Sequence, residues 1–367
     1  MWYHAVNVGW HLAATLLLWR FAARYLAPAG AWVAAAAFAV HPVHVEAVAN
    51  VVGRLELMAA VFVLAGLIAH ARRSWAAVPL FACACLSKEH AIVFLPLALA
   101  SHLVLDDKPA DAIRARWPLW IAYLAVAGTW LGAMLFATRN DPPVISAVFA
   151  GLGTGERLLT VLSIVPEYLR LLLLPIHLSA DYEPGVLTSV TRVNTSVLLG
   201  VAVLVVWVWA AVRAWRSHRV ASYALIFVPI ALAPVSNVFF PTGIALAERT
   251  LYLPSVGVCL IAGWLFENVR QRHREAAVAL GVSLLALGAV RTWTRTAVWH
   301  DSKTYALRLL EDHPESYRAH WVAGRVLRAA GNLDAARREY AIALRINPRD
   351  AAMTREALEL GVQVSPE

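Results

Sequence analysis

Histidine, carboxylate and cationic side chains gather in a few short polar segments that interrupt the long hydrophobic stretches of this chain. These segments are His41-Pro-Val-His44-Val-Glu46, Arg54 with Glu56, Lys88-Glu89-His90, and Glu248-Arg249. Ionisable groups among apolar residues are costly to bury, so a functional site is the first hypothesis for them. A carboxylate can accept a proton from a hydroxyl group, and preorganised cations can stabilise negative charge that develops in a reaction.

Three cations are candidates for binding a phosphate group: Arg54, Lys88 and Arg249. Arginine suits this role because its planar guanidinium group can donate two parallel hydrogen bonds to phosphate oxygens. For Arg54, the alternative is a structural ion pair with Glu56 or another carboxylate. For Lys88, the alternative is an ion pair with the adjacent Glu89.

His41, His44 and Glu46 have the spacing H-x-x-H-x-E. Two histidines three residues apart share one face of a helix, an arrangement that would also suit a metal ion. Pro42 indicates instead that a helix starts here, and no third ligand follows at ordinary spacing, so we expect no metal site. Hydrogen bonding to a sugar or phosphate is favoured, with interfacial histidines that are satisfied within the protein as the alternative. Glu46 is the expected acid/base or acceptor-orienting residue.

Two further segments carry candidate binding residues. Glu248 and Arg249 follow a turn signal at 241–243, and they could bind a head group or only lock the loop. Asp181 follows Leu-Ser-Ala, where a cap or turn role is favoured over contact with the site.

The composition indicates which elements must position these residues. The chain has 367 residues, of which 60% are hydrophobic and only 15% are charged, and it contains 15 Trp. Its mean hydropathy is +0.61. These values predict an all-α, polytopic membrane helical bundle. The three cysteines lie inside hydrophobic runs, so we expect neither a disulfide framework nor a zinc site.

Arginine and lysine clusters occupy alternate turns between the hydrophobic stretches. They are Arg20/Arg24, Arg72/Arg73, Lys108/Arg114/Arg116, Arg213/Arg216/Arg219 and Arg270/Arg272/Arg274. The positive-inside rule places such turns in the cytoplasm and therefore places the candidate site residues on the opposite face. The net charge of +8 is explained by these membrane anchors, so nucleic-acid binding is not expected.

The hydrophobic segments predict ten spans with the N-terminus outside. The segments are roughly 4–22, 30–41, 55–71, 75–87, 90–105, 117–137, 195–213, 221–236, 250–267 and 275–292. The stretch 156–177 contains two prolines and several charges, so we expect an interfacial or re-entrant helix there, on the outer side.

The composition changes near residue 294, where a charged, Ala-rich tail begins. From Tyr317 to Asp350 it has the offsets of one tetratricopeptide repeat, which is two antiparallel helices. Small Gly324 and Ala336 would let the helices approach, and Tyr340 would fill the gap between them. We therefore predict a multi-spanning glycosyltransferase-like domain over 1–293 and a short helical repeat region over 294–367.

Several motifs together resemble the transmembrane-and-tetratricopeptide-repeat O-mannosyltransferases, which belong to the GT-C class of glycosyltransferases. The motifs are His41 through Glu56, Leu-Ser-Lys88-Glu89, Leu171 through Asp181-Tyr, Ser236 through Tyr252-Leu-Pro-Ser, and Val298-Trp299. The resemblance implies a polyprenyl-phosphate-linked sugar as donor and a hydroxyl acceptor on the lumenal or periplasmic face. From the chemistry of their side chains, we expect substrate binding by His41, His44, Arg54, Glu56, Lys88, Glu89, Asp181, Glu248 and Arg249. Glu46 is the expected catalytic residue among the acids present.

Members of that class begin with an additional helix and an outer loop that carries an acidic pair. This sequence opens at Met1-Trp-Tyr-His4, which resembles the start of the family's second helix. The expectation is either a start codon placed too late or a truncated paralogue.

The sequence thus predicts transfer of a hexose, expected to be mannose, from a polyprenyl-phosphate donor to a protein or glycan hydroxyl. The expected partners are membrane lipid, the lipid-linked sugar and an acceptor recruited by the tail; no bound cofactor is expected, and dependence on a divalent metal stays open. The composition favours a bacterial inner membrane, with site and tail in the periplasm. The alternative is an inactive scaffold that binds partners through the tail; a transporter is less favoured because inverted repeats are not evident.

Overall fold

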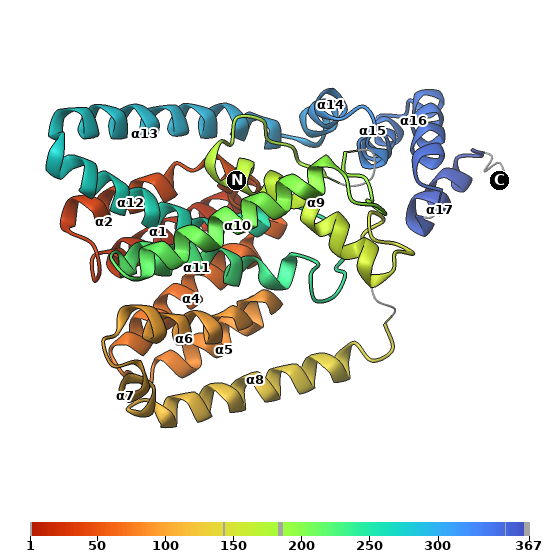
Figure 1. The fold of residues 1–367 in the computed structure, drawn as a ribbon. Helices are drawn as coiled ribbons and strands as arrows, with labels where there is room; N and C mark the ends of the chain where they lie inside the picture. Colours follow the sequence, from red (N-terminus) through yellow and green to blue (C-terminus); the bar gives the residue numbers. More distant parts are fainter. Residues whose placement is uncertain (1, 142–143, 183–185, 349, 363–367) are drawn as a thin grey trace.

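The computed structural model describes residues 2–141, 144–182, 186–348 and 350–362. Its regular elements are helices, which confirms the predicted all-α class (Figure 1). The larger part of the chain forms α1 Trp2–Ala22, α2 Pro28–Ala39, α3 Val45–Ala49, α4 Arg54–Ala71, α5 Ala77–Ser87, α6 Phe94–Leu105, α7 Pro109–Arg114, α8 Trp117–Ala137, α9 Thr154–Leu173, α10 Thr195–Trp215, α11 Arg219–Leu232, α12 Ser255–Arg272 and α13 Arg274–Thr296. The tail forms α14 Ser302–Asp312, α15 Tyr317–Ala329, α16 Leu333–Ile346 and α17 Ala351–Glu359.

Each of the ten predicted spans contains a helix, but fewer of these helices are long and apolar enough to cross a membrane. Within the described ranges there are four: Val51–Ala71, Trp117–Ala137, Thr195–Trp215 and Arg274–Trp299. A fifth span is possible if Pro28–Ala39 and Pro42–Ala49, which are bent by 45°, cross as one. Among the other predicted spans, α5, α6 and α11 are short and α12 ends in charged residues, so their crossing of the membrane stays a prediction.

Bulky side chains from distant helices form the main core. Leu18, Phe38, Leu64, Phe94 and Phe227 are fully buried in one cluster, and they come from α1, α2, α4, α6 and α11. Two glycines let α2 and α12 pack closely, because a Cβ at Gly30 would lie 2.8 Å from the Gly263 carbonyl oxygen. Small residues permit this kind of close backbone approach between membrane helices.

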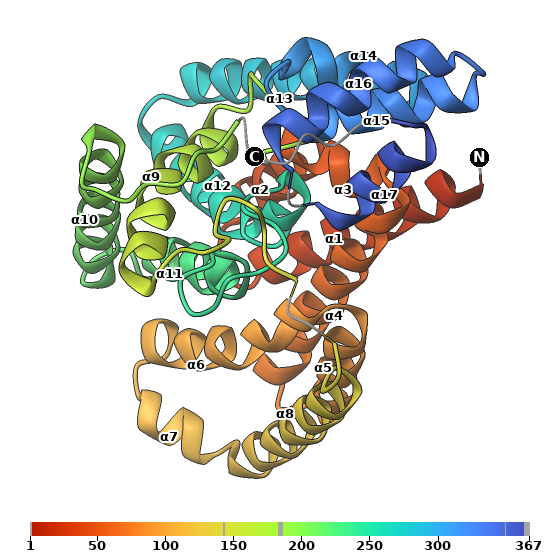
Figure 2. The same cartoon turned by 90° about the vertical axis from the view of Figure 1, so that its right-hand side faces the viewer.

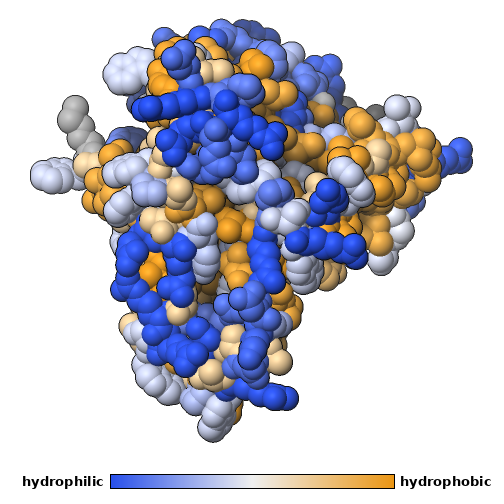
Figure 3. All heavy atoms as spheres, turned by 60° about the vertical axis from the view of Figure 1, so that its left-hand side comes forward, coloured by the Kyte–Doolittle hydropathy of each residue, from blue (hydrophilic) through white to orange (hydrophobic). Residues whose placement is uncertain are grey.

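The arginine clusters collect at one end of the helix bundle. Arg24 and Arg116 both donate to the Ala71 carbonyl at the end of α4, and Arg219 donates to Asp107 at 2.7 Å. The α10–α11 and α12–α13 junctions lie at this same end, whereas α14–α17 lie at the other (Figure 1). Figure 3 brings the arginine-rich end forward and shows hydrophilic residues gathered on it. The side of the membrane that each end faces stays a prediction.

Helix α9 packs along α10 and contributes Ile164, Tyr168 and Leu171 to a second buried cluster. A Cβ at Gly200 of α10 would collide with the Leu162 carbonyl oxygen of α9, so this glycine also permits a close contact. Helix α9 is not among the spans found in the described residues. Its predicted interfacial or re-entrant position stays a prediction.

The tail helices α15 and α16 form an antiparallel pair with its own small core. Tyr340 and Ala336 are fully buried in it, and a Cβ at Gly324 would lie 2.9 Å from the Tyr340 ring. The predicted packing of these three residues is confirmed. The assignment to a tetratricopeptide repeat and the domain boundary at 293/294 stay predictions; α13 continues to Thr296.

Candidate functional site

The closest contact between two predicted site residues joins Glu46 of α3 to Arg249 of the 3-10 turn Glu248–Leu251. The Arg249 backbone N–H donates to Glu46 Oε2 at 2.8 Å, and its guanidinium group donates to Oε1. The Glu46 side chain is only 2% exposed, whereas that of Arg249 is 21% exposed. Both carboxylate oxygens are therefore engaged by one residue, and the guanidinium still reaches solvent or a ligand.

Glu248 makes contacts quite different from those of its neighbour Arg249. Its side chain is fully buried, and the Tyr182 hydroxyl donates to its Oε1 at 3.0 Å. Its Oε2 has no hydrogen-bond partner in the described part of the chain. Burial raises the pKa of the Glu248 carboxyl to about 8; the Glu46 charge adds to this, and Arg295 opposes it. At neutral pH this carboxyl is therefore mostly protonated.

The two histidines of the H-x-x-H segment face different partners. His41 Nε2 lies 3.0 Å from the Leu172 carbonyl, and its Nδ1 accepts from the Val43 N–H, which caps the turn that Pro42 begins. His44 Nε2 lies 2.7 Å from the Ser255 hydroxyl. No group of three or more His, Cys, Asp or Glu side chains in the described residues could hold a metal ion.

His44 is the more buried of these two histidines. Its ring lies 4.4 Å from that of Phe38 and 4.6 Å from that of Tyr252, measured between centroids. Its Nδ1 has no partner within the described ranges. These contacts suit a histidine packed in the protein interior, which was the alternative to a ligand-binding role.

Arg54 does not form the ion pair with Glu56 that the sequence left open. Its Nε donates to Asn7 Oδ1 at 2.9 Å, and its Nη2 donates to the Tyr3 carbonyl at 3.3 Å. Glu56 pairs instead with His90, at 3.2 Å between Oε2 and Nε2, and both side chains are buried. Arg54 is thus a cation that has no carboxylate as an ion-pair partner among the described residues.

Lys88 and Glu89 form the adjacent ion pair considered from the sequence. Lys88 Nζ lies 3.3 Å from Glu89 Oε1, and the Glu89 side chain is 58% exposed. Solvent screens such a pair, so its contribution to stability is small. A role for either residue in substrate binding stays a prediction.

Asp181 contacts the tail and not the other predicted site residues. Its Oδ2 accepts a hydrogen bond from the Ser316 hydroxyl, and Arg318 Nη1 lies 3.9 Å from its Oδ1. Ser316 is the N-cap of α15, so Asp181 contacts the start of that helix through the Ser316 hydroxyl and is not itself the capping residue. Asp181 therefore joins the larger helical part to the tail.

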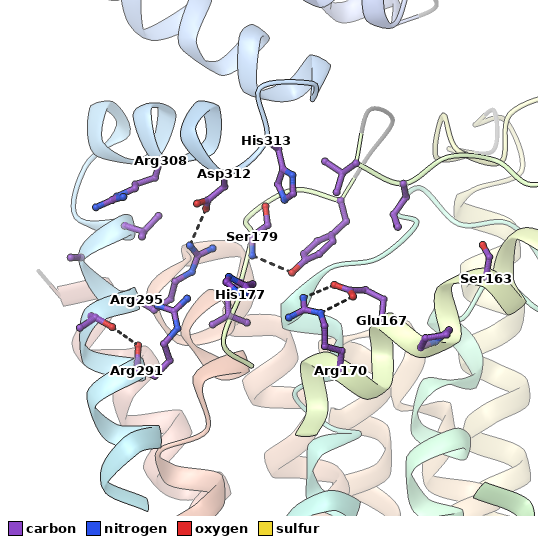
Figure 4. Close-up of a pocket in the computed structure, with 18 of the residues that line it drawn as sticks. Ser163, Glu167, Arg170, His177, Ser179, Arg291, Arg295, Arg308, Asp312 and His313 are labelled. Atoms are coloured by element: carbon purple, nitrogen blue, oxygen red, sulfur yellow. Dashed lines mark hydrogen bonds and ion pairs between the residues drawn. The ribbon is translucent and has the colours of Figure 1, made fainter. Parts of the chain in front are cut away.

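A pocket of about 1010 Å³ lies beside this junction, and none of the predicted site residues lines it. Its charged walls come from α9, α13 and α14, with Arg170, Arg291, Arg295 and Arg308 among them (Figure 4). One sequence signal could have found it: Arg291 and Arg295 are arginines at the end of α13 opposite to the arginine-rich junctions. Their partners come from distant segments and could not be predicted.

The helices and their polar ends define an all-helical membrane protein with buried ion pairs and an arginine-lined pocket. Residues 6–132 match the family described as dolichyl-phosphate-mannose-protein mannosyltransferase. Over this segment the chain is similar to that family, and it is distantly homologous to protein O-mannosyl-transferases over most of its length. Seven predicted residues, from His41 to Glu89, lie in the matched segment.

Individual proteins show the same similarity. Protein O-mannosyl-transferase F38B6.6 of Caenorhabditis elegans is 28% identical over 360 residues, which cover 94% of this chain and 51% of that protein. Protein O-mannosyl-transferase TMTC4 of Homo sapiens is 29% identical over 370 residues, covering 86% of this chain and 49% of that protein. Protein O-mannosyl-transferase Tmtc3 of Drosophila melanogaster is 28% identical over 444 residues, with coverages of 95% and 46%. The chain thus spans about half the length of these relatives, and no solved structure matches it.

Proposed function

We propose that this chain acts as a membrane glycosyltransferase on the non-cytoplasmic face of the membrane. It would move a hexose, expected to be mannose, from a polyprenyl-phosphate donor to a hydroxyl group of a protein or glycan. The family match supports the donor class, because the family is described by its dolichyl-phosphate-mannose substrate. The contact between Glu46 and Arg249 is the structural observation that carries the proposal.

In the proposed reaction, the acceptor hydroxyl oxygen attacks the anomeric carbon of the sugar. The bond from that carbon to the phosphate oxygen breaks, polyprenyl phosphate leaves with the electron pair, and the hydroxyl proton passes to a base. Negative charge therefore grows on the phosphate, where a fixed guanidinium group stabilises it. Arg249 has its backbone and one guanidinium nitrogen fixed by Glu46 and keeps further N–H groups for phosphate oxygens.

The other predicted residues take supporting roles in this proposal. Arg54, which lacks a carboxylate partner among the described residues, and Lys88 would add positive charge toward the donor. Glu46 is held through both oxygens, which favours a role in positioning Arg249 or orienting the acceptor over proton abstraction. We place acceptor recognition on the tail helices α14–α17, since repeat helices present extended binding surfaces.

A transfer assay tests the function directly. Membranes that contain the full chain would be supplied with polyprenyl-phosphate-mannose and cell-envelope protein, and mannose transfer would be measured. We expect Arg249→Ala to lower the rate by about 100-fold or more, as loss of a charge-stabilising donor does, and Arg54→Ala to lower it as well. Arg213→Ala, at the arginine-rich end, is the control. No transfer by the folded wild-type chain would contradict the proposed function.

A non-catalytic scaffold is the second candidate, and one observation favours it. Most of the predicted charges are satisfied within the chain, as in the Glu46–Arg249, Glu56–His90 and Lys88–Glu89 pairs. A scaffold would retain a partner through α14–α17 whether or not Arg249 is present. Partner capture that survives Arg249→Ala, from a chain that transfers no sugar, would support it.

A further inference from the structure

The arginine-lined pocket is built from both parts of the chain. Glu167 and Arg170 of α9 form one wall, Arg291 and Arg295 of α13 form the opposite wall, and α14 closes it (Figure 4). Its volume of about 1010 Å³ is large enough for a head group together with part of a chain.

The pocket carries excess positive charge. Its lining holds four arginines and two carboxylates, so its formal charge is 4 − 2 = +2 with histidines neutral. Arg170 is neutralised by Glu167 through two contacts of 2.7 and 2.5 Å. Arg308 is exposed and pairs with Glu311 at 2.8 Å. The charge that remains available therefore belongs to Arg291 and Arg295, and Asp312 is the lining carboxylate that opposes it.

Arg295 is a buried cation with donors that lack acceptors. Its side chain is 3% exposed, and its Nη1 lies 3.3 Å from Asp312 Oδ2. Its Nε and Nη2 have no hydrogen-bond partner in the part of the chain that the structure describes. A buried donor without an acceptor is costly, so this guanidinium is suited to an anionic ligand that supplies oxygens. The nearby Glu248, with its raised pKa, contributes little neutralising charge at neutral pH.

Arg291 lies one turn before Arg295 on the same face of α13, where side chains four residues apart are neighbours. Its Nε donates to the Ile176 carbonyl at 2.9 Å, which fixes the side chain and leaves its two terminal nitrogens. Two guanidinium groups on one face can together donate hydrogen bonds to several oxygens of one phosphate group. A carboxylate ligand has only two oxygens and would fill fewer of these donors.

The pocket is also open to an apolar group. Its lining includes Leu178, Pro166 and Val186, together with Ser196 and Leu199 at the start of α10. The two candidate spans that reach it, Thr195–Trp215 and Arg274–Trp299, are only 17% and 6% buried within the protein. Apolar helices that are exposed in this way face lipid, so an amphiphilic ligand could enter along them.

We propose that this pocket binds the phosphate group of a membrane lipid through Arg291 and Arg295. The apolar part of the lipid lies against the start of α10. The site is distinct from the residues proposed to bind the sugar donor, none of which lines it, and it does not depend on sugar transfer.

A lipid-binding measurement tests this. The full chain, freed of lipid in neutral detergent, would be titrated with short-chain phosphatidic acid, with the matching diacylglycerol and with inorganic phosphate, and adducts would be counted by native mass spectrometry. We expect phosphatidic acid to bind and diacylglycerol not to bind. Arg291→Gln with Arg295→Gln should weaken binding by about tenfold or more, because two charged hydrogen-bond donors are lost. Arg213→Gln, at the other end of the bundle, should leave it unchanged.

A second variant is expected to strengthen lipid binding, an effect that a misfolded protein would not show. Asp312→Asn removes the anion that competes for Arg295, so it should strengthen phosphatidic acid binding. Binding that is equal in wild type, the arginine variant and Asp312→Asn would overturn the proposal. Saturation by inorganic phosphate at the same concentration as the lipid would overturn the lipid assignment and leave a free-phosphate site.

Discussion

The backbone N–H of Arg249 donates to Glu46 at 2.8 Å although 203 residues separate the two along the chain. This contact joins the short helix α3 to the turn before α12 and holds the arginine side chain in place. The carboxylate is almost fully buried, and among the described residues Arg249 is the cation paired with it. The pair is therefore both a structural link and the centre of the proposed site.

The first prediction concerns the stability of this pair. Arg249→Ala leaves the Glu46 carboxylate buried without its cation, and we expect a loss of about 3–5 kcal/mol in the free energy of unfolding. The melting temperature of purified protein in detergent reports this. Glu46→Gln keeps an acceptor for the backbone N–H and should cost less. Equal melting temperatures for wild type and Arg249→Ala would show that the pair does not compensate a buried charge.

The second prediction concerns pH. The Glu248 carboxyl has an ordinary pKa of 4.5 when unfolded and about 8 when folded. As pH rises, Glu248 loses its proton at a lower pH in the unfolded state than in the folded state. The free energy of unfolding should therefore fall as pH rises from about 4.5 to 8. Glu248→Gln, which keeps the acceptor for Tyr182, should remove this part of the dependence and raise the melting temperature most above pH 8. Parallel curves for wild type and variant would contradict the raised pKa.

The third prediction concerns the attachment of the tail. Asp181→Ala removes the acceptor of the Ser316 hydroxyl, so α15 should separate more readily from the rest of the chain. We expect faster protease cleavage between α13 and α14, measured by the decay of the intact chain. Asp107→Asn is a matched control, because its exposed carboxylate pairs with Arg219 at the other end. Unchanged cleavage would mean that other contacts hold the tail.

The fourth prediction concerns orientation in the membrane. Single cysteines would be placed at the exposed Ser217, near the arginine clusters, and at the exposed Lys303 of α14, after Cys83, Cys85 and Cys259 are replaced. A membrane-impermeant maleimide should label position 303 in intact cells and position 217 only after the membrane is opened. The reverse pattern would place the tail in the cytoplasm and contradict the proposed site orientation.

Local sequence was enough to locate the helices, because helix formation and hydrophobic burial are read from neighbouring residues. It also separated the arginine clusters from the polar segments, which the structure places at opposite ends of the bundle. The packing of Gly324 against Tyr340 was predictable for the same reason, since both belong to adjacent helices with a known spacing. The number of membrane spans was not predictable in this way, because the length of an apolar helix and the charges at its ends decide whether it can cross a membrane.

The tertiary structure alone decided which charged residues that are distant in sequence become partners. Glu56 pairs with His90 and not with Arg54, although Arg54 is only two residues away in sequence. Arg295 meets Asp312 of the tail, and Arg249 meets Glu46, because the packing of distant helices brings them together. Ion pairing depends on distance and burial in three dimensions, and neither can be obtained from the spacing of residues along the chain.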